Sequence, residues 1–124
     1  MPRDFRLYLD DILEAIHQIR TYVTNQDEAA FAADRKTQDA VIRNLEIIGD
    51  AAGNLPPEIK QIAQEIDWRK ITGLRNILVH ECFGINLPIV WDVVQNKLGP
   101  LETVCRKLVE KAGENEKRKE DPPA

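Results

Sequence analysis

Apolar side chains recur every three or four residues along most of this chain, and this spacing constrains its fold more than any other feature. It is clearest in residues 4–24, in residues 35–54 and in the stretch that begins at Pro88. Such spacing gathers apolar side chains on one face of an α-helix, whereas a half-buried strand would show strict alternation, which this sequence lacks. We therefore expect an all-α fold, a helical bundle of four main helices plus one or two short ones.

Residues that cap, open or stop helices set the expected boundaries. The expected main helices, with the residue that caps or opens each, are 4–24 (Asp4), 35–54 (Asp34), 68–83 (Asp67) and the last helix (Pro88), and the short ones are 27–33 and 57–66. Gly99-Pro100 should kink the last helix, because a proline inside a helix removes a hydrogen bond. Beyond Gly113 the chain is charged and lacks apolar anchors. We expect one helical domain over residues 1–112 and a disordered charged tail over residues 113–124.

The composition indicates where the protein is located in the cell and which classes of partner it can bind. The chain has 124 residues, and 43% of them are hydrophobic, which suits one domain with a core of its own. No apolar run approaches the ~18 residues of a membrane span, and the N-terminus has no signal-peptide stretch, so we expect a cytoplasmic protein without membrane contact. With a net charge of −4, the chain lacks the excess of Lys and Arg that is typical of proteins that bind duplex nucleic acid. Any action on RNA would therefore need a local site or a partner.

Cysteines and histidines are too few and too scattered for a metal site. Cys82 and Cys105 are expected to be free thiols in a chain of this class. Only His17 and His80 accompany them, so no cluster has the ligand spacing of a zinc site. We expect neither a metal ion nor a cofactor.

The helix expected over residues 68–83 has no ordinary solvated face. One face carries the core stripe, which includes Ile71 and Leu74. A solvated face normally carries Lys and Glu, but the opposite face has neither between Ile71 and Phe83. The residues of that opposite face are Thr72, Gly73, Asn76, Val79, His80 and Phe83. Another helix or a second subunit should cover it, and ordinary burial inside the bundle would explain the pattern as well.

Three polar side chains on this helix suggest a catalytic site. Asn76 and His80 lie one turn apart, and Arg75 flanks them. Polar groups on a covered surface need hydrogen-bond partners, and a lone histidine there is more often a packed core residue. Together, however, the three suit cleavage of RNA by its own 2′-hydroxyl without a metal ion. Histidine exchanges protons near neutral pH, arginine holds a phosphate through two hydrogen bonds, and asparagine orients a hydroxyl or the histidine ring.

The spacing of these residues raises one difficulty. Arg75 and His80 point roughly 140° apart on an ideal helix, so one helix does not direct both at a single phosphate. Two copies that face each other across a two-fold axis would form a composite groove. That groove would hold two histidines, one as the base and one as the acid.

Three stretches of the sequence resemble the HepT-like toxins of the HEPN superfamily. The signature region is residues 67–102, which read DWRKITGLRNILVHECFGINLPIVWDVVQNKLGPLE. It contains the family's pattern of an arginine, a polar residue and a later histidine as Arg75, Asn76 and His80. The other stretches are residues 36–56, KTQDAVIRNLEIIGDAAGNLP, and residues 3–22, RDFRLYLDDILEAIHQIRTY. The short pattern is weak alone, but with both flanks in register it is specific.

The resemblance implies a HEPN-type homodimer that is a metal-independent endoribonuclease, the toxin of a type II-like or related toxin–antitoxin pair. Arg75 and His80 match the catalytic pair, and Asn76 matches the polar residue beside the arginine. The implied reaction cleaves RNA, such as tRNA or mRNA, and leaves a 2′,3′-cyclic phosphate and a 5′-hydroxyl. The implied partner is a minimal nucleotidyltransferase antitoxin encoded nearby, with which the dimer would form a larger complex.

One position departs from the family pattern. The family commonly continues with His-any-Tyr, and the antitoxin attaches AMP to that tyrosine, whereas this chain continues His80-Glu81-Cys82. A thiol is a poor AMP acceptor and Phe83 has no hydroxyl, so we expect no AMPylation acceptor here. Direct binding by the partner is the remaining route to inhibition.

The helix expected over residues 35–54 holds a second set of candidates. Arg43, Glu46 and Asp50 share one of its faces, at three- and seven-residue spacing. They either line the groove and orient Arg75, or form local ion pairs on a solvated face. Periodicity favours the solvated face, and the resemblance keeps Glu46 as a candidate for the groove.

Two other functions stay open. The first is a non-cleaving HEPN dimer that binds a nucleotide, RNA or a partner nucleotidyltransferase, which the net charge of −4 and Cys82 favour. The second is a purely structural bundle, in which His80→Ala and Arg75→Ala would change stability but no activity. Cleavage that depends on His80 would separate the enzyme from both.

Overall fold

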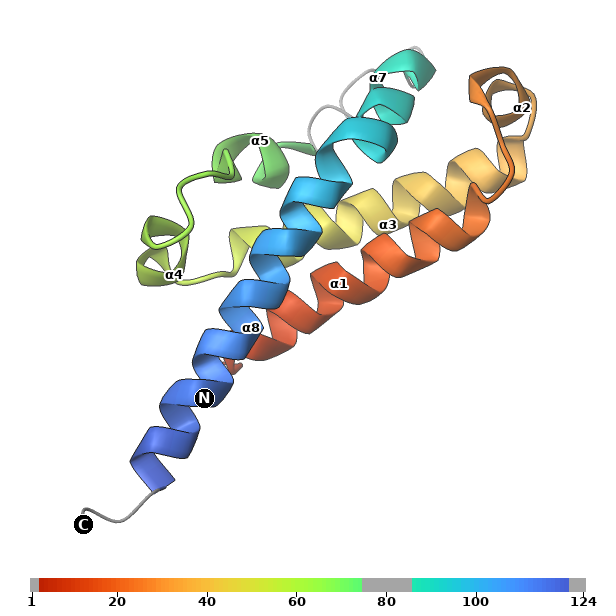
Figure 1. The fold of residues 1–124 in the computed structure, drawn as a ribbon. Coiled ribbons are helices and arrows are strands. Elements are labelled where there is room, and N and C mark those ends of the chain that lie inside the picture. Colours follow the sequence, from red (N-terminus) through yellow and green to blue (C-terminus); the bar gives the residue numbers. More distant parts are fainter. Residues whose placement is uncertain (1–2, 75–85, 121–124) are drawn as a thin grey trace.

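A computed structural model describes residues 3–74 and 86–120, with side chains as far as Glu114. All secondary structure in this part of the chain is helical (Figure 1), which confirms the all-α prediction. Its elements are α1 (Phe5–Tyr22), α2 (Glu28–Ala32), α3 (Arg35–Gly53), α4 (Pro57–Gln61), α5 (Trp68–Thr72), α7 (Leu87–Asp92), the π-helical turn η1 (Val93–Lys97) and α8 (Leu98–Glu120).

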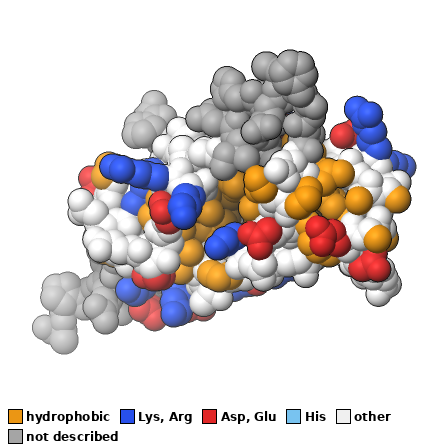
Figure 2. All heavy atoms as spheres, turned by 90° about the horizontal axis from the view of Figure 1, so that it is seen from above, with side chains coloured by type: hydrophobic (Ala, Val, Ile, Leu, Met, Phe, Trp, Pro, Cys, Tyr) orange, Lys and Arg blue, Asp and Glu red, His pale blue; other side chains and the backbone are white. Residues whose placement is uncertain are grey.

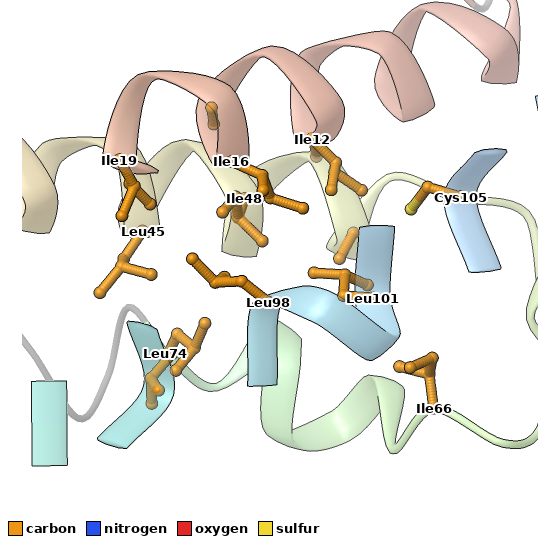
Figure 3. Close-up of a cluster of buried hydrophobic side chains, with 14 of the residues drawn as sticks. Ile12, Ile16, Ile19, Leu45, Ile48, Ile66, Leu74, Leu98, Leu101 and Cys105 are labelled. Carbon is orange, nitrogen blue, oxygen red and sulfur yellow. The ribbon is translucent and has the colours of Figure 1, made fainter. Parts of the chain in front are cut away.

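Helices α1, α3 and α8 build the hydrophobic core. Figure 1 shows α1 and α3 antiparallel and side by side, with α2 at the turn between them and α8 packed across α1. Side chains from all three helices point into one shared interior (Figure 3). Residues of this interior that are at most 1% exposed include Ile12, Ile16, Ile19, Leu45, Ile48, Leu98, Leu101 and Cys105. Burial of one Leu or Ile side chain contributes about 1.5–3 kcal/mol, so this centre is a main source of stability.

Side-chain caps mark the start of several helices. The sequence predicts caps at Asp4, Asp34 and Asp67, and each carboxylate accepts a hydrogen bond from a backbone N–H of the first turn, at 3.0, 3.1 and 3.3 Å. Asn86 caps α7 in the same way and accepts from the N–H of Ile89 at 3.2 Å. These bonds satisfy backbone donors that a helix start leaves unpaired, which confirms the three predicted caps.

The last helical stretch has its irregularity earlier than predicted. The sequence predicts a kink at Gly99-Pro100, but the structure has a π-helical turn over Val93–Lys97, immediately before α8. Pro100 has no N–H to donate to the carbonyl of Asn96 and crowds it. A wider π turn before a proline is one way for the chain to remain helical around the missing hydrogen bond.

Helix α8 is longer than the sequence predicted. It continues to Glu120, past residue 112, where we expected the helical domain to end. The disorder that we expected for residues 113–124 stays a prediction. The segment is rich in Glu, Lys and Arg, which favour helix even without apolar anchors. A helix already started by the packed residues of α8 needs no new nucleus to continue. Residues 121–124 lie outside the described part of the chain.

The connection between α3 and α5 holds α5 against the bundle. The short helix predicted over residues 57–66 ends earlier, at Gln61, and two turn bonds follow it, from Ala63 N–H to the Lys60 carbonyl and from Ile66 N–H to the Ala63 carbonyl. Trp68, at the start of α5, is 7% exposed. Its indole Nε1–H donates to the Ala63 carbonyl at 3.0 Å, which ties the start of α5 to this connection.

Candidate functional site

Helix α5 leads into the segment that carries the predicted catalytic residues. Arg75, Asn76 and His80, with Cys82 two residues further on, lie outside the described residues. The chain immediately before them is well anchored, because Trp68 is buried and Leu74 is 6% exposed. Of the helix predicted over residues 68–83, the structure therefore describes the start.

A groove of about 500 Å³ lies beside this start of the helix. One wall comes from α5 and the residues around it, and the facing wall comes from η1 and the start of α8. The lining residues are Glu65, Ile66, Asp67, Lys70, Ile71, Leu74, Val93, Asn96, Lys97 and Pro100. Leu74, which lines the groove, directly precedes Arg75 in the sequence. The groove is therefore lined by the residue that precedes the predicted catalytic segment in the sequence.

The second set of predicted site residues lies on α3. The Arg43 guanidinium is 3.8 Å from the Glu46 carboxylate, with side-chain exposures of 72% and 27%. Asp50, one turn further along, is also exposed. The local ion pair that the sequence left open is therefore present between Arg43 and Glu46. How these side chains lie relative to Arg75 is outside the described residues.

Glu46 nevertheless sits on the side of α3 that faces α5. Gly53 is seven residues after Glu46, which puts the two about 20° apart around the helix axis. A β-carbon placed on Gly53 would lie 3.4 Å from Cγ2 of Thr72 in α5, in ordinary contact. The exposed fraction of Glu46, well below that of Arg43, fits this position.

None of the groove residues was predicted from the sequence as a site residue. They include Lys70 on α5 and Asn96 and Lys97 on η1. A signal was present, because residues 67, 70, 71 and 74 and residues 93, 96, 97 and 100 follow the same three-and-four spacing. Only the fold shows that these two helical faces lie opposite each other.

The described surface carries no broad basic band on the face shown in Figure 2. There, Lys and Arg side chains stand singly among Asp, Glu and hydrophobic side chains. This distribution agrees with the net charge of −4. On this face, RNA would have to be recognised at a local site. A long basic surface, which would bind RNA through the release of counterions, is absent there.

The described part of the chain lacks both a cluster of metal ligands and a helix that could span a membrane. Among residues 3–74 and 86–120, no three His, Cys, Asp or Glu side chains lie close enough together to hold a metal ion. No helix in this part of the chain has the length and apolar character to cross a membrane.

Several known proteins are similar to most of this chain. A “Gamma-glutamylcyclotransferase and putative RNase” of Methanocaldococcus jannaschii is 36% identical over 119 residues, which is 96% of this chain but 54% of that protein, so the chain spans about half of its length. A “Probable ribonuclease HepT” of Thermococcus cleftensis is 39% identical over 108 residues, 87% of this chain and 98% of that protein. A “Putative RNase” of M. jannaschii is 42% identical over 99 residues, 79% and 82% of the two chains.

No solved structure matches the chain. The model of the ribonuclease HepT-like family matches residues 12–108, which is most of its length. The match runs from the first core helix, α1, to Leu108 near the last buried turn of α8, and it includes the groove and residues 75–80. This chain is a member of the ribonuclease HepT-like family.

Proposed function

We propose that this chain is an endoribonuclease that cleaves RNA by attack of its own 2′-hydroxyl, with Arg75, Asn76 and His80 as its catalytic residues. The observation that carries the proposal is the family match over residues 12–108, which spans all three. The relatives named as ribonucleases cover most of the chain at 36–42% identity and point the same way.

The chemistry follows from the three side-chain types. A neutral histidine accepts the proton of the 2′-hydroxyl, whose oxygen attacks the adjacent phosphorus. The bond from phosphorus to the 5′-oxygen breaks, and a protonated histidine supplies the proton that this leaving oxygen needs. The products are a 2′,3′-cyclic phosphate and a 5′-hydroxyl. Arg75 stabilises the charge on the non-bridging phosphate oxygens, and Asn76 orients the hydroxyl or the imidazole.

The mechanism needs one histidine as the base and another as the acid, and each chain supplies one candidate, His80. We propose a two-fold dimer in which the two copies of His80 act as base and acid across a shared groove. The same arrangement would solve the angular problem, because Arg75 and His80 would point roughly 140° apart on an ideal helix.

Glu46 is the supporting residue that we place beside the catalytic segment. It lies on the side of α3 that faces α5, and its carboxylate is 3.8 Å from the Arg43 guanidinium. A carboxylate in that position can accept hydrogen bonds from Arg75 and hold its guanidinium in place. Asp50, one turn further along α3, would lie at the rim of the groove that the two copies share.

We also propose that the enzyme is the toxin of a toxin–antitoxin pair and that a nucleotidyltransferase neutralises it. Cys82 stands where the family commonly has the AMP-accepting tyrosine. We therefore propose inhibition by direct binding of that partner, with no AMP transfer to position 82. Mass spectrometry of the protein after incubation with ATP and the partner would reveal any added AMP.

The first test compares matched arginine variants on RNA and on a 2′-O-methylated copy of it. The wild type should cleave the RNA alone, because the methylated copy lacks the nucleophile. Arg75→Ala should lower the cleavage rate by about 10²–10³, the usual effect of losing one charge-stabilising donor. Arg69→Ala changes an exposed arginine of α5 and should leave the rate unchanged. Equal rates for the two variants would remove Arg75 from the mechanism.

A second candidate function is a dimer that binds RNA, a nucleotide or the partner without cleaving. The net charge of −4 and the absence of the tyrosine at position 82 favour it. It predicts RNA binding that survives in Arg75→Ala and no product with a cyclic phosphate from any variant.

A further inference from the structure

The groove beside α5 has two walls of matching composition. Each wall is a helical face with the spacing i, i+3, i+4, i+7, and each offers one lysine, one other polar side chain and two apolar side chains. The α5 wall consists of Asp67, Lys70, Ile71 and Leu74, and the η1–α8 wall consists of Val93, Asn96, Lys97 and Pro100. A ligand between them would meet apolar side chains and one lysine from each wall.

Three of the four charged side chains of the groove, Glu65, Lys70 and Lys97, have no side-chain partner among the described residues, whereas the Asp67 carboxylate caps α5. The Lys70 side chain has no hydrogen-bond partner among the described residues, and its backbone N–H donates to Asp67. Within the described part of the chain, neither Lys97 nor Glu65 has an ion-pair partner. Asn96 donates from Nδ2 to the Asp92 carboxylate at 2.6 Å, which holds its amide in place and leaves its carbonyl oxygen as an acceptor.

We propose that this groove binds one nucleotide of single-stranded RNA, next to the phosphate that is cleaved. The apolar side chains of the two walls would contact the faces of the base and ribose. Lys70 and Lys97 would contact a flanking phosphate, and the Asn96 carbonyl and Glu65 carboxylate would accept hydrogen bonds from base amines or ribose hydroxyls. The proposal rests on the proposed ribonuclease function for its choice of RNA as the source of the nucleotide.

The size and charge of the groove select this ligand over larger ones. A volume of about 500 Å³ lies within the range of small-molecule sites and suits one nucleotide. The lining has two lysines and two carboxylates, from Glu65 and Asp67, so its formal charge is zero and it would not hold a duplex by electrostatics alone. An unpaired base can present its edge and both of its faces to such walls, whereas a paired base cannot.

The position of the groove ties it to the reaction. Leu74 lines it, and the next residue is the proposed catalytic Arg75. A nucleotide held there would place its neighbouring phosphate close to the catalytic segment, which converts binding into positioning of the scissile bond.

The test uses probes that the enzyme cannot cleave. AMP, GMP, CMP and UMP are each titrated into ¹⁵N-labelled full-length protein, and the amide signals of residues 67–74 and 93–99 are followed by NMR. A short single-stranded oligonucleotide with 2′-O-methyl riboses is then added as a competitor. We expect a monophosphate to shift these amides and the single strand to displace it, whereas the same oligonucleotide in a duplex should not.

Two pairs of variants locate the binding. Asn96→Trp fills the groove, and Gln95→Trp puts the same bulk on the neighbouring exposed position outside its lining. We expect Asn96→Trp alone to weaken oligonucleotide binding by about tenfold or more. Lys97→Ala should reduce the slope of log K against log salt concentration by about 0.7, the value of one contact to a single strand, and Lys107→Ala on α8 should not.

The outcomes separate this inference from the ribonuclease proposal. Equal binding by Asn96→Trp and Gln95→Trp, both folded by circular dichroism, would overturn the groove assignment even if the wild type cleaves RNA. Groove binding without any cleavage would overturn the ribonuclease proposal and leave the nucleotide site standing. Binding of a monophosphate that the single strand does not displace would overturn RNA as the source of the nucleotide.

Discussion

The indole Nε1–H of Trp68 donates to the backbone carbonyl of Ala63 at 3.0 Å, and both residues are buried. This bond closes the connection that follows α4 onto the first residue of α5. Because Leu74 and the proposed catalytic residues follow α5 in the sequence, the bond also anchors the part of the chain that leads to them.

Loss of this bond should destabilise the fold without changing its overall shape. Trp68→Phe keeps an aromatic ring but removes the donor, and the Ala63 carbonyl keeps only the longer turn bond from Ile66 N–H at 3.3 Å. We expect the free energy of unfolding to fall by about 1–3 kcal/mol in urea denaturation. Ile62→Ala, at a nearby side chain that is 57% exposed, should change it by less than about 0.5 kcal/mol. Equal unfolding midpoints for the two variants would contradict this role of Trp68.

Glu102 should make the stability of the fold depend on pH at the acidic end. On α8 it accepts from Arg20 of α1 at 2.7 Å and from Arg106 at 3.3 Å, and the hydrogen bond from Arg20 is the main cause that lowers the pKa of its carboxyl. Because the folded-state pKa lies below the unfolded one, the contribution is complete above the unfolded value of about 4.3. It disappears as pH falls through the lower folded-state pKa.

The measurement compares Glu102→Gln with the wild type by thermal unfolding across that range. At neutral pH we expect Glu102→Gln to be less stable by about 0.2–1 kcal/mol, because the pair is partly exposed to solvent. The gap should close at low pH, where both side chains are neutral. Glu110→Gln, at an exposed position of the same helix, is the control. A gap that stays constant down to low pH would show that ionisation of Glu102 is not its source.

Cys105 should be chemically silent in the folded protein. Its side chain is 0% exposed, and burial raises the pKa of its thiol to about 12. The reactive species is the thiolate, so a disulfide reagent such as DTNB should react with Cys105 only after unfolding. A Cys82→Ala background leaves Cys105 as the one thiol in the chain. Rapid reaction of this variant in buffer, at the rate seen in urea, would contradict the burial.

The sequence predicted the long helices well and their interruptions poorly. Helices α1 and α3 were predicted to within two residues at each end, because long periodic stretches with Asp4 and Asp34 as caps leave little choice. The π turn before Gly99-Pro100 was not predicted. A proline shows that one backbone hydrogen bond is missing, but not which conformation the preceding turn adopts around it. The end of α8 was placed too early, because the last position of its apolar spacing is Leu108, whereas the helix continues to Glu120.

The candidate site divides in the same way. The motif of Arg75 and His80 is local, so the sequence displays it together with its resemblance. The groove is formed by residues far apart in the sequence. Lys70 and Lys97 line the same groove only in the folded chain, where η1 lies opposite α5. The three-and-four spacing of each segment is visible in the sequence, but no pattern in the sequence pairs one helical face with the other.

The central claim is that His80 transfers protons in RNA cleavage, and the most direct test uses the two histidines of the chain. Purified wild type, His80→Ala and His17→Ala are incubated with tRNA or total RNA in excess EDTA, after circular dichroism shows that all three are folded. His17 is exposed on α1 and serves as the matched control. Our account predicts cleavage to 2′,3′-cyclic phosphate ends by the wild type and His17→Ala, and a rate about 10²–10⁴ lower for His80→Ala. Cleavage by His80→Ala at the wild-type rate, or no cleavage by any of the three folded proteins, would contradict it.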